Sequence, residues 1–217
     1  MKYSMNLAFK KAGITTLISL FVFAVMFAES IEQETPRFDR LRAMFEDNRV
    51  FVADFSHEYN DSFTGEQQHA EGRIWIGKNQ YKIDGDNQLM VVDGEVSRVY
   101  DGIKNRIIIS DYIEEEDDFA PSRMLQGVDE SYAISEETMA NGQHRITLRS
   151  DDPFAIFTEV QIILTAEGNP LRIIAIDQVD NELITEFTHG EFVPSDDELF
   201  ELTWPEDAEF IDLRHGS

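Results

Sequence analysis

The sequence contains no cysteine and few basic residues. Without cysteine the chain has no disulfides, no thiol nucleophile, no thiolate metal ligand and no site for N-terminal cysteine lipidation. It has 18 Lys and Arg against 43 Asp and Glu, a net charge of −25. Such a surface should repel nucleic acid and anionic lipid, so neither is expected as a partner. The acidity has two interpretations, which composition does not separate: solubility, as in a salty habitat, or a negative face complementary to a basic partner.

The common catalytic and cofactor motifs are also missing. The sequence has no GxSxG, no phosphate-binding P-loop and no glycine-rich dinucleotide turn. Its five histidines form no HExxH motif, and the nearest candidate pairs, His57 with Glu58 and His189 with Glu191, offer two metal ligands at most. The many carboxylates do not single out a catalytic pair. We therefore expect no metal, no cofactor and no enzymatic activity.

The N-terminus has the pattern of a secretory signal peptide. Lys2, Lys10 and Lys11 precede an uncharged apolar run over residues 14–28. A retained membrane anchor is the alternative, but the run is shorter than the roughly 20 residues that a spanning helix needs. We predict a signal peptide over residues 1–30 and export of a single domain over residues 31–217.

The hydrophobic period then predicts one helix followed by many strands. Phe38, Leu41, Met44 and Phe45 recur at helical spacing within residues 36–48, and Thr35 before Pro36 is a plausible helix start. From Val50 apolar and polar residues alternate in short runs, separated by Asp-Gly and Asn-Gly pairs that favour hairpins. About ten to eleven antiparallel strands, the last over residues 199–204, predict a barrel, a sandwich or a strongly curved sheet.

Two segments interrupt the strands. Residues 113–128 begin with an acidic run and continue with a short helix that Pro121 opens and Gly127 ends. Met124 and Leu125 form its apolar tip, so the segment is either an ordinary surface loop or a lid over one mouth of the sheet. Residues 151–157 are a candidate for a second lid.

Alternation assigns a set of large apolar side chains to the inner face of the sheet. Each of them can belong to a tightly packed core, but one helix and short lids are too little to fill so large a sheet. We therefore predict a partly open apolar cavity. Its predicted lining is Phe51, Phe55, Tyr59, Ile74, Ile76, Tyr81, Ile83, Val160, Ile162, Leu164, Leu183 and Phe187.

The order of these motifs resembles the LolA family of periplasmic outer-membrane lipoprotein carriers, over about residues 36–212. The most specific feature is VVDG followed by VYDG and an aliphatic strand. The other matching segments, in order, are RFDRLRAMF leading into FVADFSHEY, then EGRIWIGKNQYKI, FAPSRMLQG, PLRIIAIDQVDNELITEF and LFELTWPEDAEFID.

The resemblance implies a mainly β fold: an unclosed, strongly curved antiparallel half-barrel of about eleven strands, with an N-terminal helix and short lid helices over its concave face. It also implies a soluble periplasmic carrier, with no catalysis, that binds lipoprotein acyl chains. Such carriers collect lipoproteins from an ATP-driven inner-membrane complex and deliver them to an outer-membrane receptor. We expect this carrier to be a monomer.

Two features of the chain bear on that resemblance. Many family members carry a basic residue followed by proline after the second strand, and an arginine there touches a lid; here Lys78 is the nearest match and no proline follows. A receptor-type relative would need a lipidated cysteine. This chain has no cysteine, which favours the carrier. A lipid- or lipoprotein-sensing module on the same scaffold is the alternative function.

Overall fold

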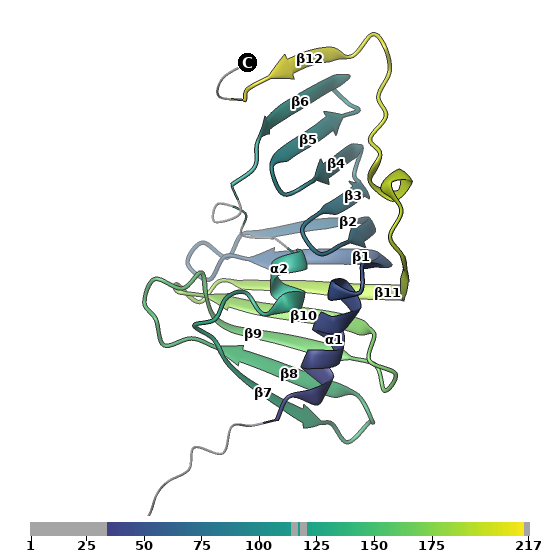
Figure 1. Ribbon diagram of the computed structural model, residues 1–217. Helices are drawn as coiled ribbons and strands as arrows, with labels where there is room; N and C mark the ends of the chain where they lie inside the picture. The colour runs from purple at the N-terminus through teal and green to yellow at the C-terminus, as the bar shows by residue number, and fades with distance from the viewer. Residues whose placement is uncertain (1–33, 114–116, 118–120, 215–217) are drawn as a thin grey trace, which may run out of the picture. The chain divides into compact units, whose positions relative to one another are not determined.

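In the computed structural model, which describes residues 34–113, 117 and 121–214, the alternating segments form one sheet of twelve strands (Figure 1). The strands are β1 Arg49–Asn60, β2 Gln67–Ile76, β3 Tyr81–Gly85, β4 Gln88–Val92, β5 Val96–Asp101, β6 Arg106–Asp111, β7 Ala133–Thr138, β8 His144–Arg149, β9 Phe157–Leu164, β10 Pro170–Asp177, β11 Glu182–Pro194 and β12 Glu209–Asp212. The helices are α1 Pro36–Glu46 and α2 Pro121–Gln126, with a short 3-10 helix, η2, at Asp197–Phe200. The predicted signal peptide lies outside the described residues.

The sheet is open, with order β12-β6-β5-β4-β3-β2-β1-β11-β10-β9-β8-β7. Neighbouring strands are antiparallel except β12, which pairs with β6 in parallel. Strand β1 lies in the middle and pairs with both β2 and the distant β11, so that Phe55 faces Gly72 on one side and Phe187 on the other. The prediction of a mainly β, unclosed sheet with short helices is confirmed.

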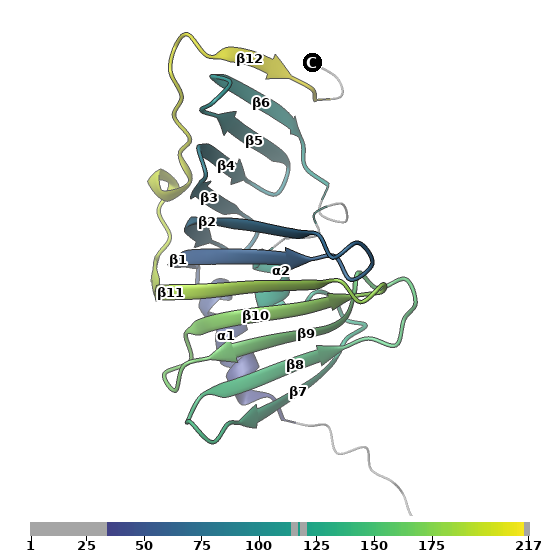
Figure 2. The same ribbon diagram turned by 180° about the vertical axis from the view of Figure 1, so that it is seen from behind.

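The helices α1 and α2 lie on the same face of the sheet: they are in front of it in Figure 1 and behind it when it is seen from the other side in Figure 2. The alternation of β1 explains the placement, because Phe51, Ala53 and Phe55 are buried on the helix side. On the opposite face Val50 and Val52 are buried in a separate, smaller cluster. The first half of β1 is therefore apolar on both faces.

The C-terminal segment covers that opposite face and corrects one prediction. Residues 199–204 do not form a strand. Residues Asp197–Phe200 instead form η2, in which the Asp196 carboxylate accepts from the amide of Glu198 at 3.0 Å, and Phe200 packs against Val50 and Val52. The apolar residues of this run are buried against the sheet face without pairing as a strand. The last strand is β12, which the alternation did not predict.

Candidate functional site

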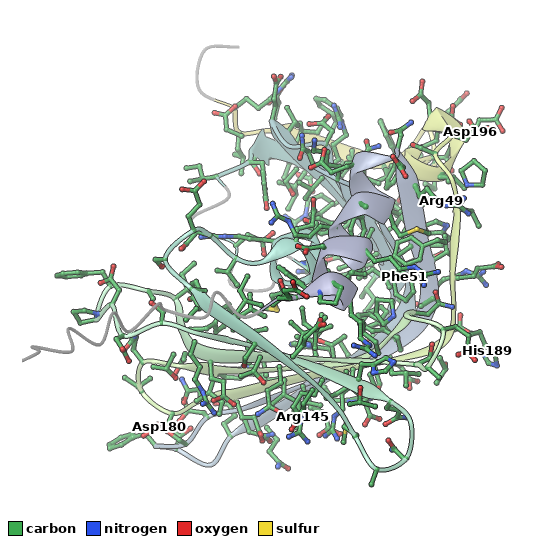
Figure 3. The ribbon with its side chains drawn as sticks, turned by 60° about the horizontal axis from the view of Figure 1, so that its bottom comes forward. Arg49, Phe51, Arg145, Asp180, His189 and Asp196 are labelled. Atoms are coloured by element: carbon green, nitrogen blue, oxygen red, sulfur yellow. The ribbon has the colours of Figure 1, made fainter. Side chains whose placement is uncertain are left out.

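The predicted cavity residues gather on the helix-covered face of the sheet. Figure 3 labels Phe51, which lies on the side that α1 covers. Nine of the twelve are buried in one apolar cluster, together with both predicted lid residues, Met124 and Leu125. The nine are Phe51, Phe55, Ile74, Ile76, Val160, Ile162, Leu164, Leu183 and Phe187. Tyr59 and Ile83 are partly buried against the cluster, and Tyr81 is buried beside it, in the wall of a hollow. We call this cluster the interior.

The interior is larger than the predicted set. Alternation along β8 could have added Ile146 and Leu148, which are fully buried. The contribution of α1, by contrast, was predicted only as an amphipathic face: Phe38, Leu41 and Phe45 are buried in the interior. The members missing from the predicted set are Phe38, Leu41, Phe45, Ala53, Tyr132, Ile146, Leu148, Phe157, Ile173 and Ala175.

Aromatic rings fasten α1 to the middle of the sheet. The ring of Phe192 in β11 lies 5.4 Å from that of Phe45 in α1 and 5.2 Å from that of Phe51 in β1. Phe51 in turn meets Phe187 edge-on at 5.4 Å. Such edge-to-face pairs add about 0.5–1.5 kcal/mol each to the burial of their area. The C-terminal end of α1 is therefore held by packing.

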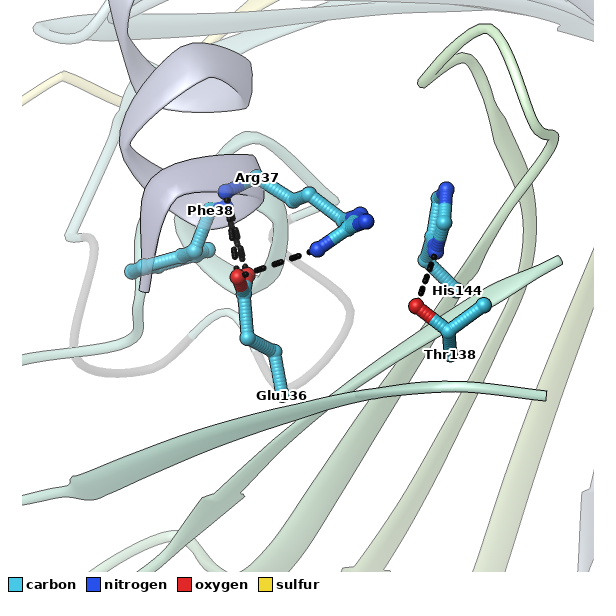
Figure 4. Close-up of polar contacts among 5 residues, drawn as sticks. All are labelled: Arg37, Phe38, Glu136, Thr138 and His144. Carbon is cyan, nitrogen blue, oxygen red and sulfur yellow. Dashed lines mark hydrogen bonds and ion pairs between the residues drawn. The ribbon is translucent and has the colours of Figure 1, made fainter. Parts of the chain in front are cut away.

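A carboxylate from the edge strand β7 holds the start of α1 (Figure 4). Thr35 is the N-cap, as predicted, but its side chain makes no capping hydrogen bond. Instead Glu136 accepts from the amides of Arg37, at 3.1 Å, and Phe38, at 3.2 Å, and pairs with the Arg37 guanidinium at 3.5 Å. These are the amides that a cap side chain would satisfy, and an anion is favoured at this end of the helix. Sequence reasoning could not find Glu136, because it is 98 residues from Phe38.

Helix α2 begins at Pro121, and Gly127 directly follows its last residue, Gln126, as predicted. Gly127 has φ +117°, and its amide and that of Val128 donate to the Arg123 carbonyl at 3.0 and 2.8 Å. A Cβ at Gly127 would lie 3.0 Å from the ring of Phe38. The turn is therefore tight, and it brings the end of α2 against α1.

Lys78, in the turn between β2 and β3, contacts both helices. Its carbonyl accepts from the side-chain amide of Gln126 in α2 at 2.8 Å. Its ammonium lies 2.6 Å from the carboxylate of Glu46, the last residue of α1. The residue nearest in position to the family's lid-contacting arginine thus contacts α2 through its backbone and α1 through its charge.

Two tyrosines bind Asp117, which precedes α2 in the chain. The hydroxyls of Tyr81 and Tyr112 both donate to the carboxylate of Asp117, at 2.6 and 2.9 Å. Burial, reinforced by the Asp117 carboxylate, raises the pKa of Tyr81 far above its ordinary value. Tyr81 therefore stays a neutral donor, and the contact joins Asp117 to β3.

Two hollows lie at opposite ends of β2. The first, of about 780 Å³, is lined by Tyr81, Lys78 and Gln126 together with charged residues of the β4–β5 turn. The second, of about 540 Å³, has walls that include Tyr59 and Leu183. Neither hollow lies in the middle of the interior, where the side chains pack against one another. The predicted acyl-chain cavity therefore stays a prediction.

The histidines of the two nearest candidate pairs, His57 and His189, have other partners. His57 Nδ1 lies 2.8 Å from the hydroxyl of Thr185, and burial lowers the pKa of His57, with a smaller contribution from His69. His189 Nδ1 lies 3.0 Å from Asp54, not from Glu191. Within the described residues no three His, Asp or Glu side chains are grouped so that they could hold a metal ion. In the same part of the chain, no helix has the length and apolar character needed to span a membrane.

Comparison with known proteins gives one sequence relative and several similar structures. No protein-family model matches the chain. It is 24% identical over 144 residues to an outer-membrane lipoprotein carrier protein from Chromohalobacter salexigens, covering 63% of this chain and 68% of the relative. An uncharacterized conserved protein from Thermus thermophilus has a similar structure, with TM-score 0.52, 12% identity and coverage of 82% of this chain and 97% of the other. A LolA superfamily protein from Nitrosomonas europaea aligns with TM-score 0.41 at 9% identity, covering 76% and 97%.

Proposed function

We propose that this LolA-like chain is a periplasmic carrier that binds lipoprotein acyl chains between its sheet and its helices. The carrier would collect lipoproteins from an ATP-driven inner-membrane complex and release them to an outer-membrane receptor, acting as a monomer. Residues 1–30 would direct export and residues 31–217 would form the carrier. The sequence similarity to an outer-membrane lipoprotein carrier supports the assignment.

One structural observation supports it most: a wide apolar sheet face is covered by very little chain. Helices α1 and α2 have 11 and 6 residues, and they contribute five buried apolar side chains to the interior. The five are Phe38, Leu41, Phe45, Met124 and Leu125. A cover of this size can move aside without unfolding the twelve-stranded sheet, and the face beneath it is apolar enough to receive acyl chains.

The free energies allow cargo to open the cover. Exposing Met124 and Leu125 costs about 1.5–3 kcal/mol each, or about 3–6 kcal/mol for α2. Burying a chain of about 16 carbons gains about 12 kcal/mol, at about 0.8 kcal/mol per CH₂. An acyl chain that replaces α2 on the interior therefore more than offsets the cost of moving it. In this proposal α2 is the lid.

A reversible lock tests the proposal. The chain has no cysteine, so Lys78→Cys with Gln126→Cys gives one pair of thiols, on the two residues that join α2 to the β2–β3 turn. A short bis-maleimide with a reducible centre would tie α2 down. Native mass spectrometry would then measure binding of a synthetic tripalmitoylated lipopeptide to a version beginning at Ile31. We expect binding to the wild type, loss of binding on cross-linking and its return on reduction.

The controls separate the lock from its chemistry. The double variant without cross-linker should bind the lipopeptide as the wild type does. So should each single-cysteine variant after reaction with a maleimide at that one cysteine. Binding that persists in the cross-linked protein would contradict the role of α2 as a lid. A wild type that stays free of lipopeptide would contradict the carrier function itself.

A further inference from the structure

Three connections at one end of the sheet carry exposed apolar side chains. Residues 61–66 join β1 to β2, residues 150–156 join β8 to β9, and residues 178–181 join β10 to β11. Their apolar side chains are almost fully in water: Phe63 is 96% exposed, Phe154 91% and Val179 67%. Figure 1 shows this end of the sheet on the left, away from α1. Large side chains gathered in water at one place indicate a binding surface.

Hydrogen bonds tie the three connections to one another. The amide of Ser62 donates to the Asn181 side chain at 2.9 Å, and its hydroxyl donates to the Val179 carbonyl at 2.7 Å. The side-chain amide of Gln178 donates to the Ala155 carbonyl at 3.0 Å. Residues 178–181 are thus bonded to both of the other connections. We call the three connections, residues 61–66, 150–156 and 178–181, the frame.

Two of the three connections line the second hollow, 150–156 through Ile156 and 178–181 through Gln178 and Val179. Its walls include Tyr59, Ile156, Phe157 and Leu183, and all four also pack in or against the interior cluster. Val179 lines the same hollow. Its volume of about 540 Å³ lies within the range of about 300–1,000 Å³ typical of small-molecule sites. Of the three exposed apolar side chains, Val179 therefore connects the surface with the interior through this hollow.

The charge on the frame has one sign. The three connections carry two, two and one acidic residues in chain order, Asp61, Glu66, Asp151, Asp152 and Asp180, and no Lys or Arg. Figure 3 labels Asp180 far from α1. A phosphate-bearing surface would be repelled here, whereas positive charge beside an acyl chain would be attracted.

We propose that this end of the sheet, framed by residues 61–66, 150–156 and 178–181, is the mouth through which acyl chains pass, and that it favours lipopeptides with basic residues next to the acylated end. The inference rests on the proposed function and deepens it. Phe63, Phe154 and Val179 receive the acyl chains at the surface. The acidic residues hold the peptide that remains outside.

Uptake rates of two synthetic probes test the mouth. Both are tripalmitoylated lipopeptides, one ending in Ser-(Lys)₄ and the other in Ser-(Glu)₄, and uptake is followed by stopped-flow fluorescence of a dye on the peptide. The apolar variant combines Phe63→Ser, Phe154→Ser and Val179→Ser. Its matched control, Ile103→Ser with Leu213→Ser, removes exposed apolar side chains outside the frame. We expect the apolar variant to take up the lysine probe about tenfold more slowly and the control to match the wild type.

A second variant tests the charge. Glu66→Gln, Asp151→Asn and Asp180→Asn remove three charges without touching Asp61 and Asp152, whose carboxylates accept backbone amides in the turns. The control, Glu167→Gln with Glu206→Gln and Asp207→Asn, removes three charges elsewhere. At low salt the wild type should take up the lysine probe about tenfold faster than the glutamate probe, and only the frame variant should lose that preference.

The outcomes separate this inference from the proposed function. If the wild type binds neither probe, the carrier function fails. If it binds the probes and the apolar variant takes them up at the wild-type rate, the mouth is wrong while the carrier function stands. Equal uptake of the two probes by the wild type would overturn the charge preference. The wild type could instead sediment with phosphatidylcholine vesicles while the apolar variant does not, with equal uptake rates for the two proteins. That result would overturn the mouth and assign the three side chains to a membrane contact.

Discussion

The contact between Glu136 and the start of α1 predicts a large difference between two neighbouring carboxylates. Glu136→Ala removes an acceptor whose side chain is only 6% exposed and leaves the amides of Arg37 and Phe38 without it. Glu137→Ala removes a carboxylate that is 60% exposed and pairs with Arg145, at 2.9 Å. Glu137→Ala is thus the matched control for Glu136→Ala.

The magnitudes follow from the contacts. Each hydrogen bond to a charged group contributes about 1.5–3 kcal/mol, so the two amide bonds contribute at least about 3 kcal/mol to the free energy of unfolding. The Arg37 ion pair, on a 41% exposed guanidinium, adds at most about 1 kcal/mol. We therefore expect Glu136→Ala to lower the free energy of unfolding by about 3 kcal/mol and Glu137→Ala by less than about 1 kcal/mol. Glu136→Gln keeps an acceptor and should fall between them.

Urea unfolding, followed by far-UV circular dichroism, measures the difference. With a slope of about 2 kcal/mol per molar urea, the midpoint of Glu136→Ala should fall by about 1.5 M, while the slope stays the same. Equal midpoints for the two alanine variants would refute the assignment of Glu136 as the cap of α1. A large effect of Glu136→Gln, equal to that of alanine, would also refute it, because the amide oxygen can still accept.

Three further substitutions test other parts of the fold. Burial raises the pKa of Tyr81, so as the pH rises the unfolded state releases the tyrosine proton first, at about pH 10. The free energy of unfolding should therefore be retained below that pH and fall above it. In urea titrations Tyr81→Phe should lower the free energy of unfolding by about 1 kcal/mol at pH 8, and its stability should decline less steeply than that of the wild type above pH 10. A Cβ on Gly72 would collide with the backbone carbonyl of Asp84, so Gly72→Ala should lower the melting temperature far more than Gly142→Ala, where a Cβ meets nothing beyond its chain neighbours and only the φ of +83° disfavours alanine. Phe200→Ala should cost about 3 kcal/mol in urea and leave lipopeptide uptake unchanged, because Phe200 packs on the face away from the helices; lost uptake would contradict the placement of the site.

The sequence was most informative where the structure depends on neighbours in the chain. Pro36 and the spacing of Phe38, Leu41 and Phe45 predicted α1 to within two residues, because a helix buries one side at its own period. Pro121 and Gly127 predicted α2 for a similar reason, since both fix local backbone geometry. The inner face of the sheet followed from alternation, and the resemblance to the LolA family is confirmed.

What depended on distant pairing could not be predicted. Nothing near Leu199 distinguishes a run that packs against the back of the sheet from one that pairs as a strand, because both need apolar residues. The parallel pairing of β12 with β6 joins residues about a hundred positions apart, and so does the capping of α1 by Glu136. Alternation also cannot separate a filled interior from an open one: Ile162 points inward in either case.

The two helices differ in how firmly they hold the interior closed. Helix α1 contributes Phe38, Leu41 and Phe45, worth about 4.5–9 kcal/mol at about 1.5–3 kcal/mol each, and Glu136 adds about 3 kcal/mol. Helix α2 contributes two such side chains, or about 3–6 kcal/mol. A gain of about 12 kcal/mol from one acyl chain easily displaces α2 but barely offsets α1. Cargo should therefore open the interior at α2 while α1 stays in place, and hydrogen exchange should show faster opening at residues 121–126 than at residues 36–46 in the empty protein.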